Sequence, residues 1–565
     1  MRRILTHILR AAVCCFGLAA TLGAADSGAR ELGDLFVQKT AATLHVYTDA
    51  VWYTPSQSHT VRWTANPQGD PYPYAYTLRL ENIGTGEMLG WVNTTNGTLS
   101  TTPVDVMGNA PGNFVVVPVP TVDRMLARSG AAPSEQGHYQ YVLTVWDSTV
   151  SRPVKQAWSK FQVRSAPSLT LSSDTEISSD TTWSGVVKLS AQVFVNDGAT
   201  LTVEPGTTVL AAGQNAVIVV ERGGKLMSVG RKELPIVYTC NAAVGERFQS
   251  CWAGLIILGR ATVNVDADER FAEGVSPVNR PAYGGDDDDD SSGSIMYTRV
   301  EFAGVDFTPE IQPNAFGFHG LGRGTTIDYI QAHLGEDDGV EFFGGTVNAK
   351  HVVSSGSKDD SIDWAFGWRG HGQYFFVQQS PVQGDQGLEM DNNELGPNNE
   401  PRTNPQLFNV TLVGSQAADL GFLLRLGAAM ELSNCVITGF GEFGVSLVDD
   451  PTLAQVDDKT LRNCTFWNNA GSNTIEGMIR SNNLAYVSSQ PGILAVDPRL
   501  RNTRWEPNPD PRPADGSPVF AIGASASAPS EGFFDTDAVY RGAFAEDLWI
   551  EEWTRFGDES WYTQP

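Results

Sequence analysis

The sequence predicts an all-β chain in which a small β-sandwich precedes a right-handed parallel β-helix. Three observations favour this fold class. Glycine and proline number 57 and 31 among 565 residues, while only 18% of residues are charged, which is typical of short strands joined by many turns. Short runs of alternating apolar residues fill the region before residue 165. After about residue 170 such runs recur with a period of roughly 22–30 residues and show no helical pattern.

The first 25 residues have the features of an export signal. Three arginines lie among the first ten residues, an apolar run follows at residues 11–22, and small residues at 23–25 precede Asp26. This segment is too short for a comfortable membrane span, and no later stretch reaches that length. We therefore expect residues 1–25 to be cleaved and the mature chain to contain no transmembrane segment.

Residues 35–165 are expected to form a β-sandwich of immunoglobulin-like or fibronectin-like type. Apolar side chains alternate along several runs, so that each run presents one apolar face. The clearest alternations are Val61-Trp63-Ala65, Tyr74-Tyr76-Leu78-Leu80 and Tyr139-Tyr141-Leu143-Val145. No cysteine lies in this region, which excludes the inter-sheet disulfide of antibody domains.

Residues 170–500 are expected to form the β-helix. Related short runs begin at Asn314, Asp338, Asp360 and Gln386, and a second set begins at Asn409, Asn434 and Asn463. Coils of parallel strands would stack about 4.8 Å apart, with alternate apolar residues filling the interior. Leucine-rich repeats share this period, but their Leu-x-x-Leu-x-Leu spacing is missing here.

An acidic ladder is predicted on the outside of three consecutive coils. In the runs at 340–342, 362–364 and 388–390, two apolar residues flank one carboxylate, and strand alternation places that carboxylate outward. The three outward residues are Glu341, Asp363 and Glu389, with Asp338 and Asp360 in the adjoining turns. Like charges about 5 Å apart repel, which raises their pKa values or recruits a cation, and clusters of oxygen ligands suit Ca²⁺.

These five carboxylates are the candidate metal ligands, and the three strand carboxylates together with Arg369 are the candidate ligand-binding residues. Lys358 and Arg369 are expected to bring positive charge to the ladder. If they do not reach it, a bound cation, with Ca²⁺ as the candidate, should take their place. The alternative is a solvated acidic edge with backbone donors close by at the turns.

The charge balance limits the class of partner. Acidic residues number 65 and basic residues 38, which gives a net charge of −27. Nucleic acid is a poor partner because binding its phosphates requires an excess of Lys and Arg. Cations, or neutral ligands in acidic grooves, fit better, with plain solubility in a salty medium as the alternative. The densest acidic run, Asp286–Asp290, is typical of a solvated loop, and calcium recruitment is its alternative.

Four cysteines remain after the export signal, an even count that suits an oxidising compartment. Cys240 and Cys251 flank a polar loop and are predicted to form a disulfide. Cys435 and Cys464 should both point inward on neighbouring coils. Stacked Cβ atoms there would lie about 4.8 Å apart, slightly long for a relaxed disulfide, so these two cysteines are expected to be buried thiols.

A set of motifs in the second part of the chain carries a family resemblance. The motifs are Trp252-Ala253-Gly254-Leu255, Gly284-Gly285 with the acidic stretch that follows, Asp337–Gly345, Asp359-Asp360, Gly387–Asn392, and Tyr540–Phe544 with Trp549 and Trp553. Together they resemble a family of secreted or surface right-handed β-helix proteins of Gram-negative bacteria, with no assigned function. The resemblance spans roughly residues 170–555. It implies a pectin-lyase-like architecture and a location outside the cell or on its outer surface, and it carries over no catalytic residues. Residues 501–565 are expected to be an irregular capping segment.

These features favour a non-catalytic extracellular or cell-surface protein. Its acidic face would bind polysaccharide, cell-envelope components or divalent cations. The alternative is a carbohydrate-active enzyme, a polysaccharide lyase or a glycoside hydrolase, because pectin-lyase-like helices often act on polysaccharides. A lyase needs a basic residue opposite the carboxylates, and Arg369 and Arg425 are the candidates.

Overall fold

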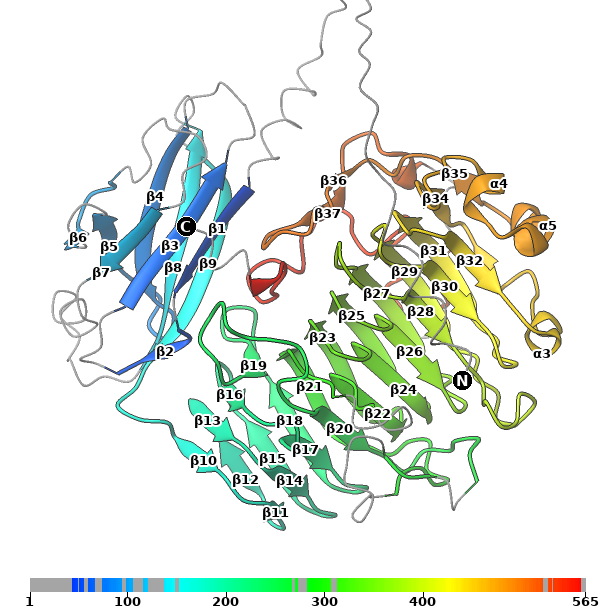
Figure 1. The fold of residues 1–565 in the computed structure, drawn as a ribbon, viewed down its shortest axis with the longest axis horizontal. Coiled ribbons are helices and arrows are strands. Elements are labelled where there is room, and N and C mark those ends of the chain that lie inside the picture. Colours follow the sequence, from blue (N-terminus) through cyan, green and yellow to red (C-terminus); the bar gives the residue numbers. More distant parts are fainter. Residues whose placement is uncertain are drawn as a thin grey trace, which may run out of the picture.

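The computed structural model consists of parallel coils stacked along one axis, a smaller two-sheet module and a C-terminal segment (Figure 1). It describes residues 43–48, 50–54, 59–66, 74–93, 98–104, 115–119, 137–147, 152–266, 270–272, 282–305, 312–521, 527–530 and 532–559. The predicted export signal, residues 1–25, lies outside these ranges. No helix in the described part of the chain is long and apolar enough to cross a membrane.

Two sheets that share one apolar core form the N-terminal module. The smaller sheet has the strand order β1-β3-β7, and the larger has the order β2-β9-β8-β4-β5-β6. Trp63, Tyr141 and Phe161 are among the inward residues, as strand alternation predicts. Whether this module is of immunoglobulin-like or fibronectin-like type stays a prediction. The strands are β1 (Thr43–Thr48), β2 (Trp52–Tyr53), β3 (His59–Asn66), β4 (Tyr74–Asn82), β5 (Glu87–Asn93), β6 (Thr98–Ser100), β7 (Val115–Val119), β8 (Gly137–Asp147) and β9 (Arg152–Val163).

A parallel β-helix follows, as the repeat period and the family resemblance predict. Its longer sheet adds one strand per coil. Its members are β10 (Leu169–Leu171), β13 (Val186–Leu189), β16 (Thr208–Ala211), β19 (Ile236–Cys240), β21 (Gly293–Glu301), β23 (Thr326–His333), β25 (Asn348–Ser355), β27 (His371–Gln378), β29 (Gln406–Val413), β31 (Glu431–Thr438), β34 (Thr465–Trp467) and β35 (Leu494–Ala495). Four short strands extend it: β12 (Thr181–Trp183), β15 (Thr200–Val203), β18 (Lys225–Val229) and β33 (Leu461–Arg462).

A second parallel sheet forms another face of the coils, and this face positions the acidic residues. Its strands are β11 (Thr175–Ile177), β14 (Gln192–Val195), β17 (Val217–Val220), β20 (Gly254–Leu258), β22 (Phe316–Leu321), β24 (Val340–Gly345), β26 (Ile362–Ala365), β28 (Gln386–Met390), β30 (Leu420–Leu424) and β32 (Phe443–Leu447). Val340, Ile362 and Leu388 occupy the same register position, and all three point into the interior. The alignment of coils predicted from the sequence is therefore confirmed here.

In the coils from β21 to β34, one corner is a single residue in the left-handed backbone region. In the longer sheet the corner residues are Tyr297, Tyr329, His351, Tyr374, Asn409, Asn434 and Asn463, with φ between 45° and 63°. Asparagine tolerates this conformation better than other non-glycine residues. The aromatic corners offset their strain by stacking, with ring centroids 4.4 Å apart for Tyr297–Tyr329 and 4.0 Å apart for Tyr329–His351. The asparagine repeat seen in the sequence is thus a column of corners.

Apolar side chains fill the interior of the helix along its whole length. Two of the largest, Trp364 and Trp368, lie behind the acidic face and are fully buried. Phe342 stacks on Trp368 with centroids 4.2 Å apart. Burying each such aromatic side chain contributes on the order of 2–3 kcal/mol, so this packing fixes the backbone that carries the carboxylates.

Three short helices, absent from the sequence prediction, lie near the far end of the coils. They are α3 (Asp450–Leu453), α4 (Ile475–Met478) and α5 (Ser481–Ser489). Asn483 of α5 accepts a hydrogen bond from the N–H of Leu447 and donates one to its carbonyl, at 2.9 Å each. These bonds satisfy backbone groups of β32, the edge strand, which would otherwise be open to pairing with another chain.

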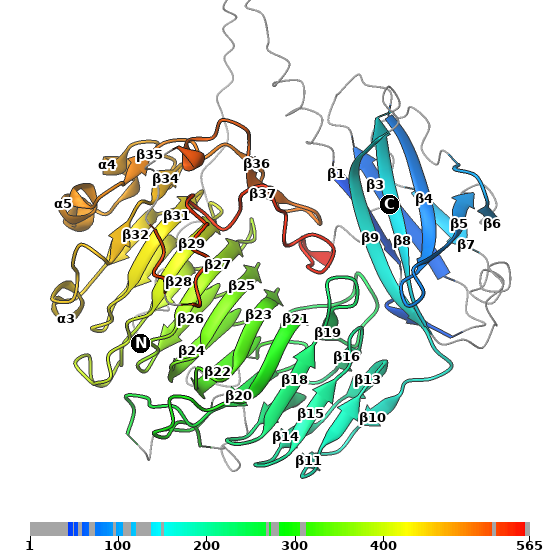
Figure 2. The same ribbon diagram turned by 180° about the vertical axis from the view of Figure 1, so that it is seen from behind.

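The C-terminal segment returns along the outside of the longer sheet toward the N-terminal module (Figure 2). It contains β36 (Leu500–Asn502), β37 (Asp510–Pro513) and the 3₁₀ helix η2 (Pro518–Phe520). Asn409 donates to the carbonyls of Ala538 and Tyr540, at 3.2 and 2.8 Å. Trp549 and Trp553 pack against the aromatic corners. The segment therefore covers the side of the longer sheet, while α5 covers an edge strand at the far end.

Both cysteine pairs are disulfides. Cys240–Cys251 was predicted, and its Cα atoms lie 5.7 Å apart. The prediction of buried thiols at Cys435 and Cys464 is wrong, because these residues are also joined. Their Cα atoms approach to 4.5 Å, within the range that a disulfide spans. The ideal spacing between coils overestimated the separation of these two residues.

Candidate cation site

The three strand carboxylates of the predicted ladder lie side by side on consecutive coils. Glu341 pairs in register with Asp363, and Asp363 with Glu389, across β24, β26 and β28. Their neighbours Val340, Ile362 and Leu388 point into the core, so the carboxylates occupy the opposite face. The structure thus places these three predicted residues together.

A second column lies at the turn before each strand. The side-chain oxygen of Asn314 accepts the N–H of Asp338 at 3.1 Å, and Asp338 accepts the N–H of Asp360 at 2.9 Å. Asp360 in turn accepts the N–H of Gln386 at 2.7 Å. Each bond links one coil to the next and uses the Oδ1 atom of the accepting side chain. The turn column is therefore part of the hydrogen bonding between coils, which agrees with the backbone donors expected at the turns.

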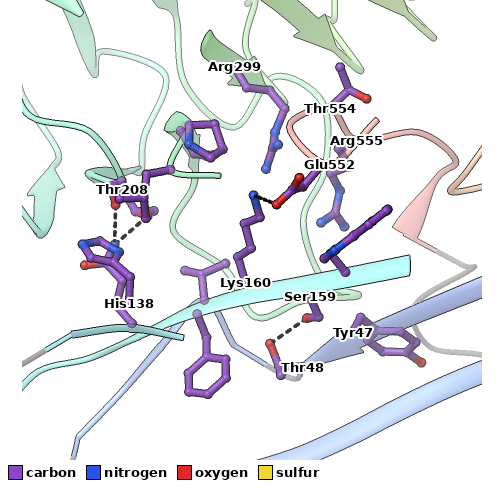
Figure 3. Close-up of a pocket in the computed structure, with 18 of the residues that line it drawn as sticks. Tyr47, Thr48, His138, Ser159, Lys160, Thr208, Arg299, Glu552, Thr554 and Arg555 are labelled. Atoms are coloured by element: carbon purple, nitrogen blue, oxygen red, sulfur yellow. Dashed lines mark hydrogen bonds and ion pairs between the residues drawn. The ribbon is translucent and has the colours of Figure 1, made fainter. Parts of the chain in front are cut away.

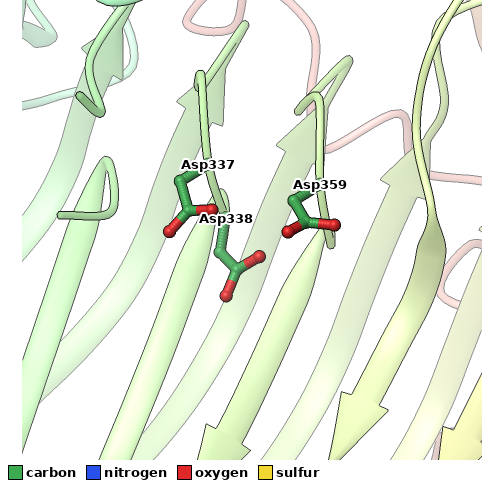
Figure 4. A group of neighbouring side chains, drawn as sticks. All are labelled: Asp337, Asp338 and Asp359. Carbon is green, nitrogen blue, oxygen red and sulfur yellow. The ribbon is translucent and has the colours of Figure 1, made fainter. Parts of the chain in front are cut away.

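The carboxylates of the two columns, together with Asp337, Asp359 and Asp385, form triplets that are each within reach of one ion. One oxygen each from Asp338, Glu341 and Asp363 lies within 4.8 Å of the others. Two further triplets share residues with the first: Asp337, Asp338 and Asp359, shown in Figure 4, and Asp359, Asp360 and Asp385. Ca²⁺ binds oxygens at 2.3–2.6 Å, so ligands of one ion lie up to about 5 Å apart. Each triplet meets that limit.

These side chains are buried although they lie on the outer face of the sheet. Asp338, Glu341, Asp360 and Asp363 expose between 3% and 9% of their surface. The segment before β22 contributes to this cover: Gln312 donates to Asp337 at 3.3 Å, and Asn314 donates to Glu341 at 2.5 Å. The expectation of a solvated acidic edge is therefore wrong for these four residues.

Burial and mutual repulsion make ionisation unfavourable. Burial, followed by the charges of neighbouring carboxylates, raises the pKa of Asp338, Asp360 and Asp363 well above the ordinary range. Burial raises the pKa of Glu389 to about 7, although Arg425 acts against that rise. Burial also raises the pKa of Asp385 to about 6. At neutral pH the cluster must therefore retain protons or hold compensating positive charge.

Arg425 supplies positive charge at one end of the ladder. Its guanidinium lies 3.0 Å from Glu389 and binds both oxygens of Asp391, at 2.8 and 3.1 Å. Burial alone would lower the pKa of Arg425, but hydrogen bonds to Asp391 and the charge of Glu389 raise it. Asp391 was not among the predicted residues, and its position two residues after Glu389, on the same strand face, is the signal that could have found it.

The two basic residues predicted to neutralise the ladder have other partners. Arg369 was expected at the ladder, and this prediction is wrong. Its guanidinium binds Asp288 at 2.6 Å and the carbonyls of Thr262 and Gly367. Lys358 forms an ion pair with Glu336 in the preceding turn. The ion-pair partners of Arg369 and Lys358 could not be inferred from the sequence, because both side chains are long and their partners lie on other coils or loops.

The acidic run Asp286–Asp290 is occupied by interactions within the chain. Asp288 accepts the N–H of Thr262 at 2.9 Å, and Asp290 accepts the N–H of Arg260 at 2.9 Å. Asp289 pairs with Arg323 at 3.0 Å. Partial burial alone would raise the pKa of Asp288, but the hydrogen bonds from Thr262 and Arg369 lower it. These contacts favour the loop interpretation of this run over calcium recruitment.

Comparison with known proteins gives one match. A family model described as a pectate-lyase like beta helix domain matches residues 175–490, more than half of the chain. The match ends before the C-terminal segment and begins after the two-sheet module. No curated protein and no solved structure matches the chain.

Proposed function

The chain belongs to the family defined by the pectate-lyase like beta helix domain, and from this premise we propose that it is an exported, non-catalytic protein that binds Ca²⁺ through its acidic ladder and polysaccharide through the bound ion. The family makes it a carbohydrate-related β-helix protein. The two disulfides suit a compartment outside the cytoplasm, and a location outside the cell or on its outer surface is part of the proposal.

One observation carries the cation proposal. Nine carboxylates gather on and beside three consecutive coils: Asp337, Asp338, Glu341, Asp359, Asp360, Asp363, Asp385, Glu389 and Asp391. Ionisation of all nine would leave a large excess of negative charge over Arg425, so the cluster must retain protons or hold a cation. Buried charges need pairing or a metal, and an all-oxygen set of carboxylates favours Ca²⁺ over transition metals.

The residues that would hold the ion are those of the first triplet, Asp338, Glu341 and Asp363. Their backbone is fixed by the packed interior and by the hydrogen bonds between turns, which supports a preformed site. A bound Ca²⁺ would supply a positive centre able to accept carboxylate or hydroxyl oxygens of a sugar chain. Extracellular calcium modules bind with a Kd of about 10⁻⁴–10⁻³ M, and we expect this range here.

A carbohydrate-active enzyme is the rival function, because acid and base catalysis of glycoside cleavage uses paired carboxylates and such pairs occur here between coils. The arginines support the non-catalytic interpretation. Arg425 has a raised pKa and is held by two carboxylates, which makes it a poor base for a lyase. Arg369 is bound to Asp288 instead.

Binding of the mature protein to a panel of acidic and neutral polysaccharides, with Ca²⁺ or with a chelator, tests the proposal. We expect retention of acidic polysaccharides that depends on Ca²⁺, without release of shorter or unsaturated products. Release of such products by the wild type, and its loss in an Asp363→Asn/Glu389→Gln variant, would establish the enzyme instead. Absence of any Ca²⁺-dependent retention would contradict the binding role.

A further inference from the structure

Five carboxylates occupy the same turn position on five consecutive coils. The N–H of Asp385 donates to the carbonyl of Asp359 at 3.1 Å, and that of Asp419 to the carbonyl of Asp385 at 2.9 Å. Glu442 continues the line, because its N–H donates to the carbonyl of Asp419 at 2.9 Å. The strand register adds Asp337 at the other end. We call the five residues the outer column, and Figure 4 shows its first two members on successive turns.

The middle of the outer column is accessible to a ligand. Asp337 is buried, whereas Asp359 and Asp385 are half-buried and Asp419 is exposed. Glu442 is paired with Arg480, at 3.2 Å. Burial, followed by the charges of Asp359 and Asp419, raises the pKa of Asp385 to about 6. The carboxylates of the accessible part therefore repel one another, and positive charge beside them would stabilise their ionised form.

Two buried amide oxygens beside the outer column lack a hydrogen-bond donor. Oε1 of Gln379 and Oε1 of Gln386 have no hydrogen-bond partner among the described residues, and the two side chains expose only 2% and 6% of their surface. Gln386 follows Asp385 directly, and its side chain hydrogen-bonds to that carboxylate. A side chain at Gly384, the residue before Asp385, would collide with Oε1 of Gln379. Both oxygens thus lie next to Asp385, and an N–H group of a ligand would remove the cost of leaving them unpaired.

Apolar surface lies beside the same turns. Val382, three residues before Asp385, exposes 78% of its surface, and Phe248 exposes 58%. A hydrogen bond of 2.8 Å between Gln249 and Gln383 holds the two loops together. Apolar side chains next to carboxylates suit an aliphatic cation, whose methylene groups cover the apolar surface while its charge stays at the acid.

The spacing of the outer column favours a linear polyamine over other cations. Coils lie about 4.8 Å apart, which is close to the separation of two amines joined by three methylene groups. An extended basic peptide presents side chains on one face about 6.8 Å apart, so its lysines would fall out of step with the carboxylates. A single metal ion would neutralise one point of the column and would make no use of the apolar side chains.

We propose that the outer column binds a linear triamine with three-carbon spacing, whose nitrogens lie against Asp359, Asp385 and Asp419. Each protonated amine donates charge-assisted hydrogen bonds to one carboxylate. The central, secondary amine has two N–H groups, which match the carboxylate of Asp385 and Oε1 of Gln386. The methylene groups extend along the side of Val382. This site differs from the first triplet in its residues and its ligand, so it does not depend on Ca²⁺ binding there.

Calorimetric titration of the mature, full-length protein, freed of metal ions, with bis(3-aminopropyl)amine tests this proposal. At pH 7 most of Asp385 is ionised, and low ionic strength limits screening. We expect this triamine to bind. We expect bis(hexamethylene)triamine, which has the same number of amines at a wider spacing, to bind at least about tenfold more weakly, because it can pair with fewer carboxylates at once.

Substitutions in the outer column should weaken the binding of bis(3-aminopropyl)amine. Asp385→Asn/Asp419→Asn should weaken it at least about tenfold, since two of three ion pairs are lost. Gln386→Met keeps the size of the side chain but removes the acceptor, and should weaken binding about three- to tenfold. The matched control Asp266→Asn/Asp286→Asn, which removes two exposed carboxylates elsewhere, should bind as wild type does.

Four outcomes would overturn the proposal. Absence of binding to the wild type refutes the site, and equal affinity for the two triamines refutes the match of spacing; both tests use the wild type alone, so a variant that fails to fold cannot hide the answer. Full affinity in Asp385→Asn/Asp419→Asn, or loss of affinity in Asp363→Asn/Glu389→Gln, would place the amine outside the outer column. Ca²⁺ binding that Asp385→Asn/Asp419→Asn abolishes, without any binding of the triamine, would make the column a metal site instead.

Discussion

Replacing two ladder carboxylates, Asp363→Asn with Glu389→Gln, should abolish a stabilisation by Ca²⁺ that the wild-type protein shows above neutral pH. At 5 mM Ca²⁺ and a Kd of about 10⁻⁴–10⁻³ M, an ion that binds only the folded state stabilises it by about 1.1–2.3 kcal/mol. The unfolding entropy is about 2.1 cal/mol/K per residue, or roughly 0.6 kcal/mol/K for the 300 or so residues of the β-helix. The expected rise in Tm is therefore about 2–4 °C.

The same carboxylates should make the effect depend on pH. Burial raises the pKa of Glu389 from 4.5 to about 7, and each unit corresponds to about 1.4 kcal/mol, so ionising this one group in the folded protein costs about 3 kcal/mol. A carboxyl with a raised folded pKa contributes stability that is complete below its unfolded pKa and is lost as the pH rises through its folded pKa. Without Ca²⁺ the protein should thus lose stability between about pH 4.5 and 7 from this group.

Thermal unfolding followed by circular dichroism at pH 5 and pH 8, with 5 mM Ca²⁺ or a chelator, measures both effects. We expect the rise in Tm at pH 8 and almost none at pH 5, where protons already neutralise the ladder. The variant Asp266→Asn/Asp286→Asn, which removes two exposed carboxylates outside the ladder, is the matched control and should keep the full response. No response of the wild type at pH 8, or a full response of Asp363→Asn/Glu389→Gln, would refute the reasoning.

Three other predictions concern the scaffold. Cys464→Ser should lower the free energy of unfolding by about 3–4 kcal/mol, because the disulfide with Cys435 closes a loop of 29 residues. Mass spectrometry of the alkylated, unreduced wild-type protein should find no free thiol at either position. Trp364→Ala should cost about 3–5 kcal/mol in chemical denaturation, since the ring is fully buried behind the acidic face, and a smaller loss would mean that the site collapses around the cavity. Asn409→Gly should keep the corner conformation but lose the hydrogen bonds to Ala538 and Tyr540. The C-terminal segment should then become sensitive to protease while the coils stay intact. Unchanged resistance to protease would contradict the role of this asparagine.

The stacking of coils and the order of the acidic residues could be predicted from the sequence. Strand side chains alternate with a period of two, so once Val340, Ile362 and Leu388 are recognised as inward, the residue after each must lie outward. The repeat then places Glu341, Asp363 and Glu389 on neighbouring strands. The asparagine repeat was also visible in the sequence, but only the structure shows that Asn409, Asn434 and Asn463 are left-handed corners, a conformation that few residues tolerate.

Other features required the tertiary structure, because they depend on contacts between residues far apart in the chain. Backbone alternation fixes the face on which a carboxylate lies, but only packed neighbours decide whether it is buried, as Gln312 and Asn314 help to do here. Long flexible side chains follow no periodic rule, so of the two arginines named as candidates only Arg425 reaches the ladder, while Arg369 pairs with Asp288. The cavity between the N-terminal module, the first coils and the C-terminal segment (Figure 3) is the clearest case, since the residues that line it come from three separate parts of the chain and meet only in the folded protein.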